Sequence, residues 1–153
     1  MTIAASLTGS DGQRPAVPRA VFITGASGFI GRALGNRYRA LGAEVRGMDL
    51  KADEKNAVVA GDLSNPRGWA DHAKGCDLFI NTAAVVSLNA PWDLYRNVSV
   101  RGARNALDAA IAGGAQRYVH YSSVAALGWD FEGEVDEKRP VVIGEDYRYG
   151  VAK

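Results

Sequence analysis

The sequence predicts an α/β fold in which helices pack on a parallel sheet of five strands. Two observations support this prediction. Short apolar runs alternate along the chain with longer segments in which apolar residues recur at helical spacing. Strands that alternate with helices pair in parallel, because right-handed crossovers return each strand to the same end of the sheet.

The predicted strands are short apolar segments bounded by glycine or polar residues. The first contains Val21, Phe22 and Ile23 in an unbroken run, which is typical of a strand buried on both faces. Four later segments of similar length also contain apolar residues, although those at 44–49, 77–81 and 117–122 include charged ones. The predicted strands therefore span residues 20–24, 44–49, 57–60, 77–81 and 117–122.

Helices are predicted in the intervals between these strands. The first runs from Ile30 to Leu41 and ends at Gly42, a residue that readily terminates a helix. A weak helix is predicted over 65–74, with Pro66 in its first turn. A longer one spans 91–112, where Leu94, Val98, Ala103, Leu107 and Ile111 are expected on one face.

The C-terminal part of the sequence is less regular. Residues 128–145 form a polar segment, predicted as a surface loop, and a last helix is expected to begin near Asp146. Within that loop, residues 129–138 are acidic and expected to be solvated; alternatively, Trp129 and Phe131 help to cover a substrate cleft.

Composition limits the function. The chain has 18 Lys and Arg against 17 Asp and Glu, a net charge of +1, which gives no electrostatic case for binding nucleic acid or an acidic membrane surface. The single cysteine, Cys76, excludes an internal disulfide and a zinc cluster, so no metal site is predicted. A flexible leader over 1–19 and one domain over 20–153 are expected, without a secretory signal or membrane helix, which favours a cytoplasmic protein.

Three glycines at a spacing of three follow the first strand, in the sequence Thr24-Gly25-Ala26-Ser27-Gly28-Phe29-Ile30-Gly31. The first glycine suits a tight turn, the second allows the backbone to approach a pyrophosphate, and the third allows the helix to pack close to the strand. The helix N-terminus offers free N–H groups to phosphates. We therefore expect a dinucleotide to contact Gly25, Ser27, Gly28, Phe29 and Ile30.

Two acidic residues extend the predicted dinucleotide site. Asp49 ends the second strand, where a carboxylate accepts hydrogen bonds from both adenosine ribose hydroxyls and repels a 2′-phosphate. NAD is therefore preferred over NADP, although Arg46 is a cation in the same strand. Asp62 and Leu63 follow the third strand and are expected to cap the adenine pocket. The plainer alternatives are a solvated turn residue at Asp49 and an ordinary Gly-Asp turn at Asp62.

A proton-transfer group is predicted near the end of the chain. Tyr149 and Lys153 lie four residues apart and share one face of a helix. A nearby ammonium favours the phenolate form of a tyrosine, which suits it to act as a base. Ser123 follows the fifth strand, at the edge where ligands of open α/β sheets bind, and can donate to a substrate oxygen. The set suits hydride transfer from an alcohol; the alternative is a surface Tyr–Lys contact.

These segments resemble the extended short-chain dehydrogenase/reductase superfamily, in its order and spacing from Val21 to the end. The resemblance implies a doubly wound Rossmann fold, a bound nicotinamide dinucleotide and Tyr–Lys–Ser chemistry, with the catalytic hydroxyl at Ser123. It also implies that Ala83 and Ala84 line the nicotinamide side of the cofactor and that Asn97 is largely structural. Lys153 is expected to hold the nicotinamide ribose. Residues 122–128 look more like the 3β-hydroxysteroid dehydrogenase branch than like epimerases, which usually carry Tyr where this chain has Leu127.

Extended members run to about twice this length, so the chain is expected to be a fragment that lacks the substrate-binding region and leaves the fifth strand as an exposed edge. Three functions stay open. The first is NAD-dependent oxidation of a secondary alcohol, or reduction of its ketone; the second is epimerisation or dehydration of a sugar nucleotide with tightly bound NAD. The third is a non-catalytic dinucleotide-binding module. The long helix and the final one can form a homodimer interface, as the resemblance suggests.

Overall fold

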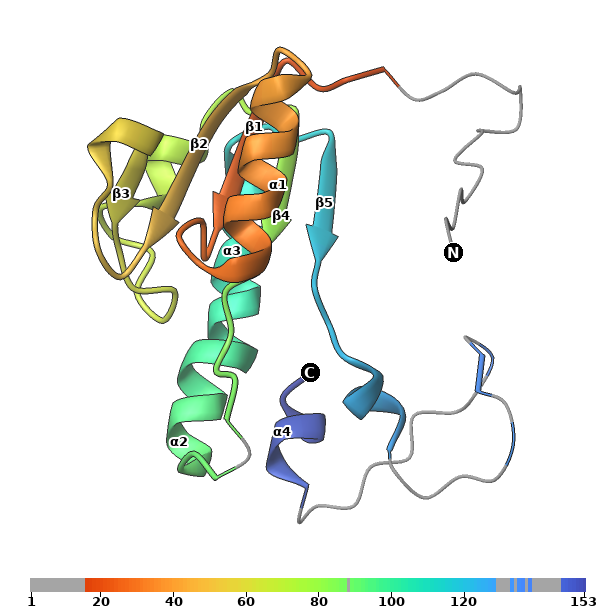
Figure 1. Cartoon of the computed structure of the whole chain (residues 1–153). Coiled ribbons are helices and arrows are strands. Elements are labelled where there is room, and N and C mark those ends of the chain that lie inside the picture. The colour runs from red at the N-terminus through yellow and green to blue at the C-terminus, as the bar shows by residue number, and fades with distance from the viewer. Residues whose placement is uncertain (1–15, 88, 129–132, 134, 137, 139–146) are drawn as a thin grey trace.

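The chain folds around one parallel sheet (Figure 1). The computed structural model describes residues 16–87, 89–128, 133, 135–136, 138 and 147–153. The strand order is β3-β2-β1-β4-β5, so the order reverses at β1. The α/β class and the parallel pairing are as predicted. The strands are β1 (Ala20–Thr24), β2 (Glu44–Asp49), β3 (Val58–Ala60), β4 (Leu78–Asn81) and β5 (Arg117–His120).

Helices cover both faces of the sheet. Alternate residues of β1 point to opposite faces: Val21 and Ile23 pack with the helix α1 (Phe29–Ala40), whereas Phe22 packs on the other side with Trp69 and the helix α3 (Gly102–Ala112). Figure 1 shows α1 and α3 on opposite sides of the strands. This is the doubly wound arrangement that the resemblance implied.

The long helical segment has an irregular centre. It begins as α2 (Trp92–Leu94), continues as the π-helical segment η3 (Tyr95–Arg101) and ends as α3. The predicted apolar face is wrong, because Leu94 and Ile111 are exposed. Small residues pack inward instead, since they let the helix approach the sheet closely, and the wider π turn changes the register of the face. The buried residues are Tyr95, Ser99, Gly102, Ala106, Ala109 and Ala110.

Other boundaries moved by a few residues. The weak helix predicted over 65–74 is one short turn, η2 (Ala70–Ala73), and β3 begins only at Val58 because Ala57 has a left-handed φ of 53° after the turn η1 (Glu54–Asn56). Past β5 the structure describes two short helical elements, η4 (Val124–Leu127) and α4 (Arg148–Val151). Residues 1–15, most of the predicted loop over 128–145, and Asp146 lie outside the described residues.

The fifth strand lies at an edge of the sheet, as predicted. Within the part of the chain that the structure describes, β5 pairs with β4 alone, and Val119 and His120 are exposed. No helix in the described part of the chain is both long and apolar enough to cross a membrane.

Candidate dinucleotide and proton-transfer site

The glycine-rich turn is fixed from both neighbouring strands. The Gly25 and Ala26 N–H groups donate to the Met48 carbonyl at 2.9 and 3.2 Å, and the Thr82 hydroxyl donates to the Thr24 carbonyl at 2.7 Å. Gly25 has a φ of +69°, and a Cβ there would lie 2.9 Å from the Ala83 nitrogen. The turn therefore has the tight bend that was predicted for this glycine.

The third glycine contacts the turn more closely than the strand. A Cβ on Gly31 would lie 2.2 Å from the Gly25 carbonyl oxygen and 2.9 Å from the Ala26 Cα. The helix α1 thus packs directly on the turn. Its N-cap, Gly28, provides no side-chain hydrogen bond, and its first turn contains no acidic side chain. The N–H groups of that turn have no acceptor within the helix, which makes this N-terminus suitable for an anion.

Asp49 lies beside the same turn. Its Oδ2 accepts the Ser27 N–H at 2.9 Å and its Oδ1 accepts the Leu50 N–H at 2.7 Å. A carboxylate has about four acceptor positions, so each oxygen can accept a further hydrogen bond. Asp49 is half-buried, and no ion pair of the described residues involves it. The side chain is therefore a fixed, uncompensated negative charge.

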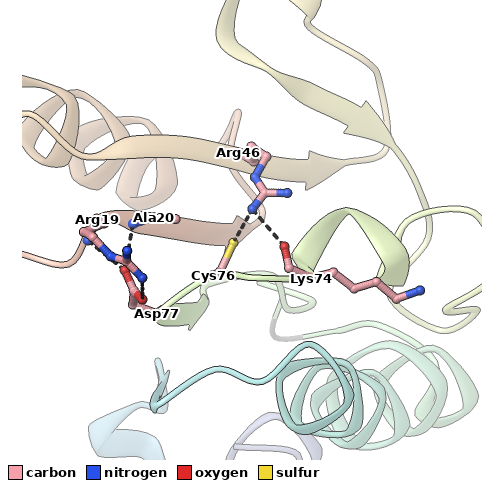
Figure 2. Close-up of polar contacts among 6 residues, drawn as sticks. All are labelled: Arg19, Ala20, Arg46, Lys74, Cys76 and Asp77. Carbon is pink, nitrogen blue, oxygen red and sulfur yellow. Dashed lines mark hydrogen bonds and ion pairs between the residues drawn. The ribbon is translucent and has the colours of Figure 1, made fainter.

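Arg46 points away from this part of the molecule. Its guanidinium donates to the carbonyls of His72 and Lys74 at 2.9 and 3.0 Å and to the Cys76 Sγ at 3.2 Å. Figure 2 shows Arg46 reaching the segment that leads into β4. Burial raises the pKa of the Cys76 thiol, which suits the small core residue expected there. The concern that Arg46 favours NADP therefore finds no support in the geometry.

Asp62 and Leu63, the residues predicted to cap the adenine pocket, differ in their surroundings. One Asp62 oxygen accepts the Ser64 N–H and hydroxyl at 2.8 Å each, within a tight turn. The Leu63 side chain is buried, and a Cβ on Gly102 would lie 2.7 Å from it. Leu63 can therefore reach a ligand only through its backbone. Ala83 and Ala84 follow β4 and are half-buried, with Ala83 directly against Gly25.

Large apolar side chains are exposed where the strands end. Among the described residues, the four most exposed are Phe29 at 95%, Val86 at 81%, Val124 at 77% and Leu50 at 76%. They follow the carboxyl ends of β1, β4, β5 and β2 respectively. We call this side of the sheet the carboxyl edge. Exposed apolar groups gathered on one side of a sheet are typical of a ligand or partner surface.

A row of polar side chains crosses the sheet just beneath this edge. Thr24, Asn81 and His120 occupy the same level of β1, β4 and β5. The Thr24 hydroxyl donates to the Asn81 Oδ1, and the Asn81 amide lies 3.0 Å from the His120 Nδ1. Burial, and secondarily Lys153, lower the pKa of His120. Because an amide nitrogen only donates, the His120 Nδ1 accepts in this bond, a link that no short sequence pattern indicated.

The two serines after β5 have distinct contacts. Ser123 is the N-cap of η4, and its hydroxyl oxygen accepts the Ala125 N–H at 3.2 Å. Its hydroxyl hydrogen remains available to donate to a substrate oxygen. The Ser122 hydroxyl instead donates to the Lys153 carbonyl at 2.7 Å. This bond holds the end of the chain against the segment that carries Ser123.

Tyr149 and Lys153 lie together, although α4 ends before the lysine. The Lys153 Nζ is 5.5 Å from the centroid of the Tyr149 ring, within the range of a cation–π contact. Both side chains are half-buried, and burial lowers the pKa of the Lys153 ammonium. The predicted proximity of phenol and ammonium is thus present, over the ring face.

Two residues that no sequence pattern indicated hold this region together. Tyr95 is fully buried, and its ring lies 6.4 Å from that of Tyr149. Ser99 is also buried, and its hydroxyl accepts the Val85 N–H at 3.1 Å. Asn97 is half-buried, and its side-chain oxygen accepts from the Arg101 guanidinium at 3.4 Å. The inward polar residue of this helix is therefore Ser99, which neither apolar periodicity nor the resemblance indicated.

A glycine turn against an uncapped helix, an acidic residue at the end of the second strand and an apolar carboxyl edge define a nucleotide-binding α/β sheet. The family model of the NAD dependent epimerase/dehydratase family matches residues 21–153. The chain belongs to this family.

Curated relatives agree with this assignment. A 3-beta-hydroxysteroid dehydrogenase of Mycolicibacterium neoaurum is 34% identical over 115 residues, which cover 67% of this chain and 31% of that protein. A ceramide reductase of Caulobacter vibrioides is 38% identical over 113 residues, 69% of this chain and 35% of that protein. The chain spans about a third of the length of these relatives.

Solved structures share the fold. A short-chain dehydrogenase/reductase superfamily protein from Agrobacterium tumefaciens, with bound NAD, matches with a TM-score of 0.78 and 31% identity over 88% of this chain and 42% of that one. A glucuronic acid dehydrogenase from Chromohalobacter salexigens matches with a TM-score of 0.73 and 30% identity, covering 88% of this chain and 52% of that one. The resemblance to the extended short-chain dehydrogenases is confirmed.

Proposed function

We propose that this chain is the NAD-binding part of an oxidoreductase that interconverts a secondary alcohol and its ketone. The observation that carries the proposal is the set of groups at the carboxyl edge: an uncapped helix N-terminus on a glycine turn, a fixed carboxylate and a Tyr–Lys pair. The two curated relatives named above, which are 34% and 38% identical to this chain, are a dehydrogenase and a reductase, which supports a redox reaction.

The residues present fit a dinucleotide. The first turn of α1 offers its N–H groups to the pyrophosphate beside Gly25, Ser27 and Gly28. Asp49 accepts the adenosine ribose hydroxyls and, because its charge is uncompensated, repels a 2′-phosphate. The exposed side chains of Phe29, Ile30 and Leu50 offer apolar surface for the rings. Asp62, the backbone of Leu63, and Ala83 and Ala84 complete the proposed set.

The chemistry assigned to the chain is proton transfer. NAD, when bound, supplies the acceptor for the hydride that leaves the alcohol carbon. Tyr149, as the phenolate, takes the hydroxyl proton, and Lys153 stabilises that negative charge and holds the nicotinamide ribose. Ser123 donates to the substrate oxygen and orients it. In ketone reduction the same phenol returns the proton.

Binding and turnover test the proposal separately. Calorimetry should show NAD⁺ binding with clear preference over NADP⁺, and Asp49→Asn should weaken NAD⁺ and reduce that preference. Incubating the full-length gene product and NAD⁺ with a panel of secondary alcohols, including a 3β-hydroxysterol and a uronic acid, should release NADH. The absence of NAD⁺ binding would refute the proposal, and binding without turnover of any alcohol by the full-length product would favour a non-catalytic module.

Epimerisation or dehydration of a sugar nucleotide is the second candidate. It is supported by a solved structure titled MoeE5 in complex with UDP-glucose and NAD, which is 25% identical over 87% of this chain with a TM-score of 0.74. NAD is regenerated in each such cycle, so UDP-glucose would be converted without release of NADH.

We also propose that residues 20–153 form one domain after a leader. We propose further that the protein is a homodimer and is located in the cytoplasm.

A further inference from the structure

Tyr95 is held rigidly at the point where the helical segment begins its π turn. The side chain is fully buried, and its hydroxyl donates to the Ser87 carbonyl. Its ring packs in a small apolar cluster with Ala90 and Ala152, against which Val85 is also packed. A buried ring with its polar end bonded has little freedom to move.

The Tyr95 ring also contacts Tyr149, the proposed general acid and base. The rings of Tyr95 and Tyr149 lie 6.4 Å apart at an interplanar angle of 65°, which is an edge-to-face contact. Tyr149 stands in a helix of only four residues, too short to be stable by itself. Its ring therefore depends on neighbours for its position, and among these Tyr95 is fully buried while Tyr147 is half-buried.

Tyr95 also fixes the segment that follows β4. That segment contains Ala83 and Ala84, the residues proposed to line the nicotinamide. It is tied to the helix by two bonds: Ser99 accepts the Val85 N–H, and Tyr95 donates to Ser87. Tyr95 and Ser99 lie four residues apart in this helical segment, and both are buried. Tyr95 thus contacts the segment after β4 through its hydroxyl and the Tyr149 ring through its own ring.

We propose that Tyr95 is a positioning residue that sets where the Tyr149 phenol lies relative to the nicotinamide-side segment 83–87. This inference rests on the proposed function for its catalytic meaning. The contact itself is a property of the folded chain. Small displacements of a reacting group have large effects on rate, so loss of the ring should slow turnover much more than it weakens NAD⁺ binding.

Fluorine NMR of the full chain, labelled with ring-fluorinated tyrosine, tests the inference without a known substrate. Each signal is assigned by single Tyr→Phe replacement. Tyr95→Leu should narrow the Tyr149 signal and move it toward that of an exposed tyrosine. Tyr95→Phe keeps the ring and should leave the Tyr149 signal near its original position. Tyr38→Leu, which removes a half-buried ring on α1, is the matched control and should not move it.

Each outcome has a defined meaning. A Tyr149 signal unchanged in Tyr95→Leu overturns the inference. If that variant does not fold, a through-space contact between the Tyr95 and Tyr149 signals in the unsubstituted protein decides, and its absence overturns the inference. If NAD⁺ moves neither signal and does not bind in calorimetry, the proposed function fails, while the ring contact is judged separately. With an active alcohol, Tyr95→Leu should lower kcat about 10-fold or more and leave the Kd of NAD⁺ within about 2-fold.

Discussion

Two aspartates stand at opposite ends of the sheet, and their oxygens have different partners. At the amino end, the Asp77 Oδ2 accepts the Arg19 and Ala20 N–H groups at 2.8 and 3.0 Å, and its Oδ1 pairs with the Arg19 guanidinium at 3.4 Å (Figure 2). At the carboxyl edge, Asp49 accepts two backbone N–H groups and has no ion pair among the described residues. Asp77 is thus paired with an exposed arginine, whereas Asp49 has no cationic partner among the described residues.

Apolar and polar side chains repeat this contrast. Toward the start of β4, Arg46 bonds to two carbonyls and to Cys76, which is buried. Beyond the strand ends on the other side, Phe29 and Val86 are almost fully exposed. Because burial and satisfied hydrogen bonds stabilise a fold, we infer that the amino end contributes mainly to stability. Changes at the carboxyl edge should mainly affect ligands and chemistry.

Replacing the proposed acid/base is the strongest test of this division. Tyr149→Phe removes one hydroxyl and keeps the ring in contact with Tyr95 and Lys153. Turnover of an active alcohol should fall about 10²- to 10⁴-fold, the usual contribution of a positioned general acid or base. Thermal unfolding and NAD⁺ affinity should hardly change. Tyr38→Phe is the control, and comparable turnover in the two variants would remove Tyr149 from the site.

A substitution in the glycine turn should affect both stability and ligand binding, unlike substitutions elsewhere at the carboxyl edge. Gly31→Ala puts a Cβ 2.2 Å from the Gly25 oxygen, so α1 and the turn must move apart. We expect unfolding free energy to fall by about 1–3 kcal/mol, together with a marked loss of NAD⁺ affinity in calorimetry.

Gly35, on the same helix, provides the matched control. A Cβ there would lie 3.2 Å from the flexible Arg39 guanidinium and 3.7 Å from the Val45 Cγ1, which is an ordinary van der Waals distance. Gly35→Ala should be neutral or stabilise by up to about 1 kcal/mol, because alanine favours a helix. Equal effects at the two glycines would show that backbone contact with the turn is unimportant.

Substitution of Arg46 tests the contribution of the amino end of the sheet to stability. Arg46→Met keeps a long apolar stem but leaves the His72 and Lys74 carbonyls without their donor. The partly exposed guanidinium should contribute about 1–2 kcal/mol, measured by urea unfolding, with no change in NAD⁺ affinity. Arg104→Met, which breaks only a surface pair with Asp108, should cost less than about 0.5 kcal/mol. Weaker NAD⁺ binding in Arg46→Met would contradict the view that this arginine stabilises the fold without affecting the ligand.

The sequence predicted the part of the fold in which apolar runs are continuous. β1 has the predicted bounds because it is an unbroken apolar segment, as is typical of a strand buried on both faces. β2 also has the predicted bounds, although Glu44, Arg46 and Asp49 interrupt its apolar residues. The inward face of the long helix could not be predicted from apolar periodicity, since Gly102, Ala106 and Ser99 pack inward and Ile111 does not. There, close approach of backbones decides which side is buried, and hydrophobicity does not.

The candidate site shows the same limit. The glycine turn, Asp49 and the Tyr–Lys pair have local sequence patterns, and all were predicted. The Thr24–Asn81–His120 row and the Tyr95–Tyr149 contact join residues 39 to 57 positions apart. Such pairs depend on strand register and on a π turn, which no short pattern in one sequence specifies.

The smallest expected effect concerns Asp77 and pH. Hydrogen bonds from the Ala20 N–H and from Arg19 hold the pKa of Asp77 below its ordinary value. A carboxyl with a lowered pKa in the folded state stabilises the fold above its unfolded pKa of about 4, and that contribution is lost as pH falls through the folded pKa. In urea unfolding, Asp77→Asn should therefore be less stable than the unsubstituted protein at neutral pH, and the difference should vanish in acid. NAD⁺ affinity should not change. Asp108→Asn removes an exposed ion pair with Arg104, so its effect on stability should depend more weakly on pH and should decrease with added salt. If the stability difference between Asp77→Asn and the unsubstituted protein is the same at every pH, the hydrogen bonds of Asp77 stabilise the fold and its charge does not.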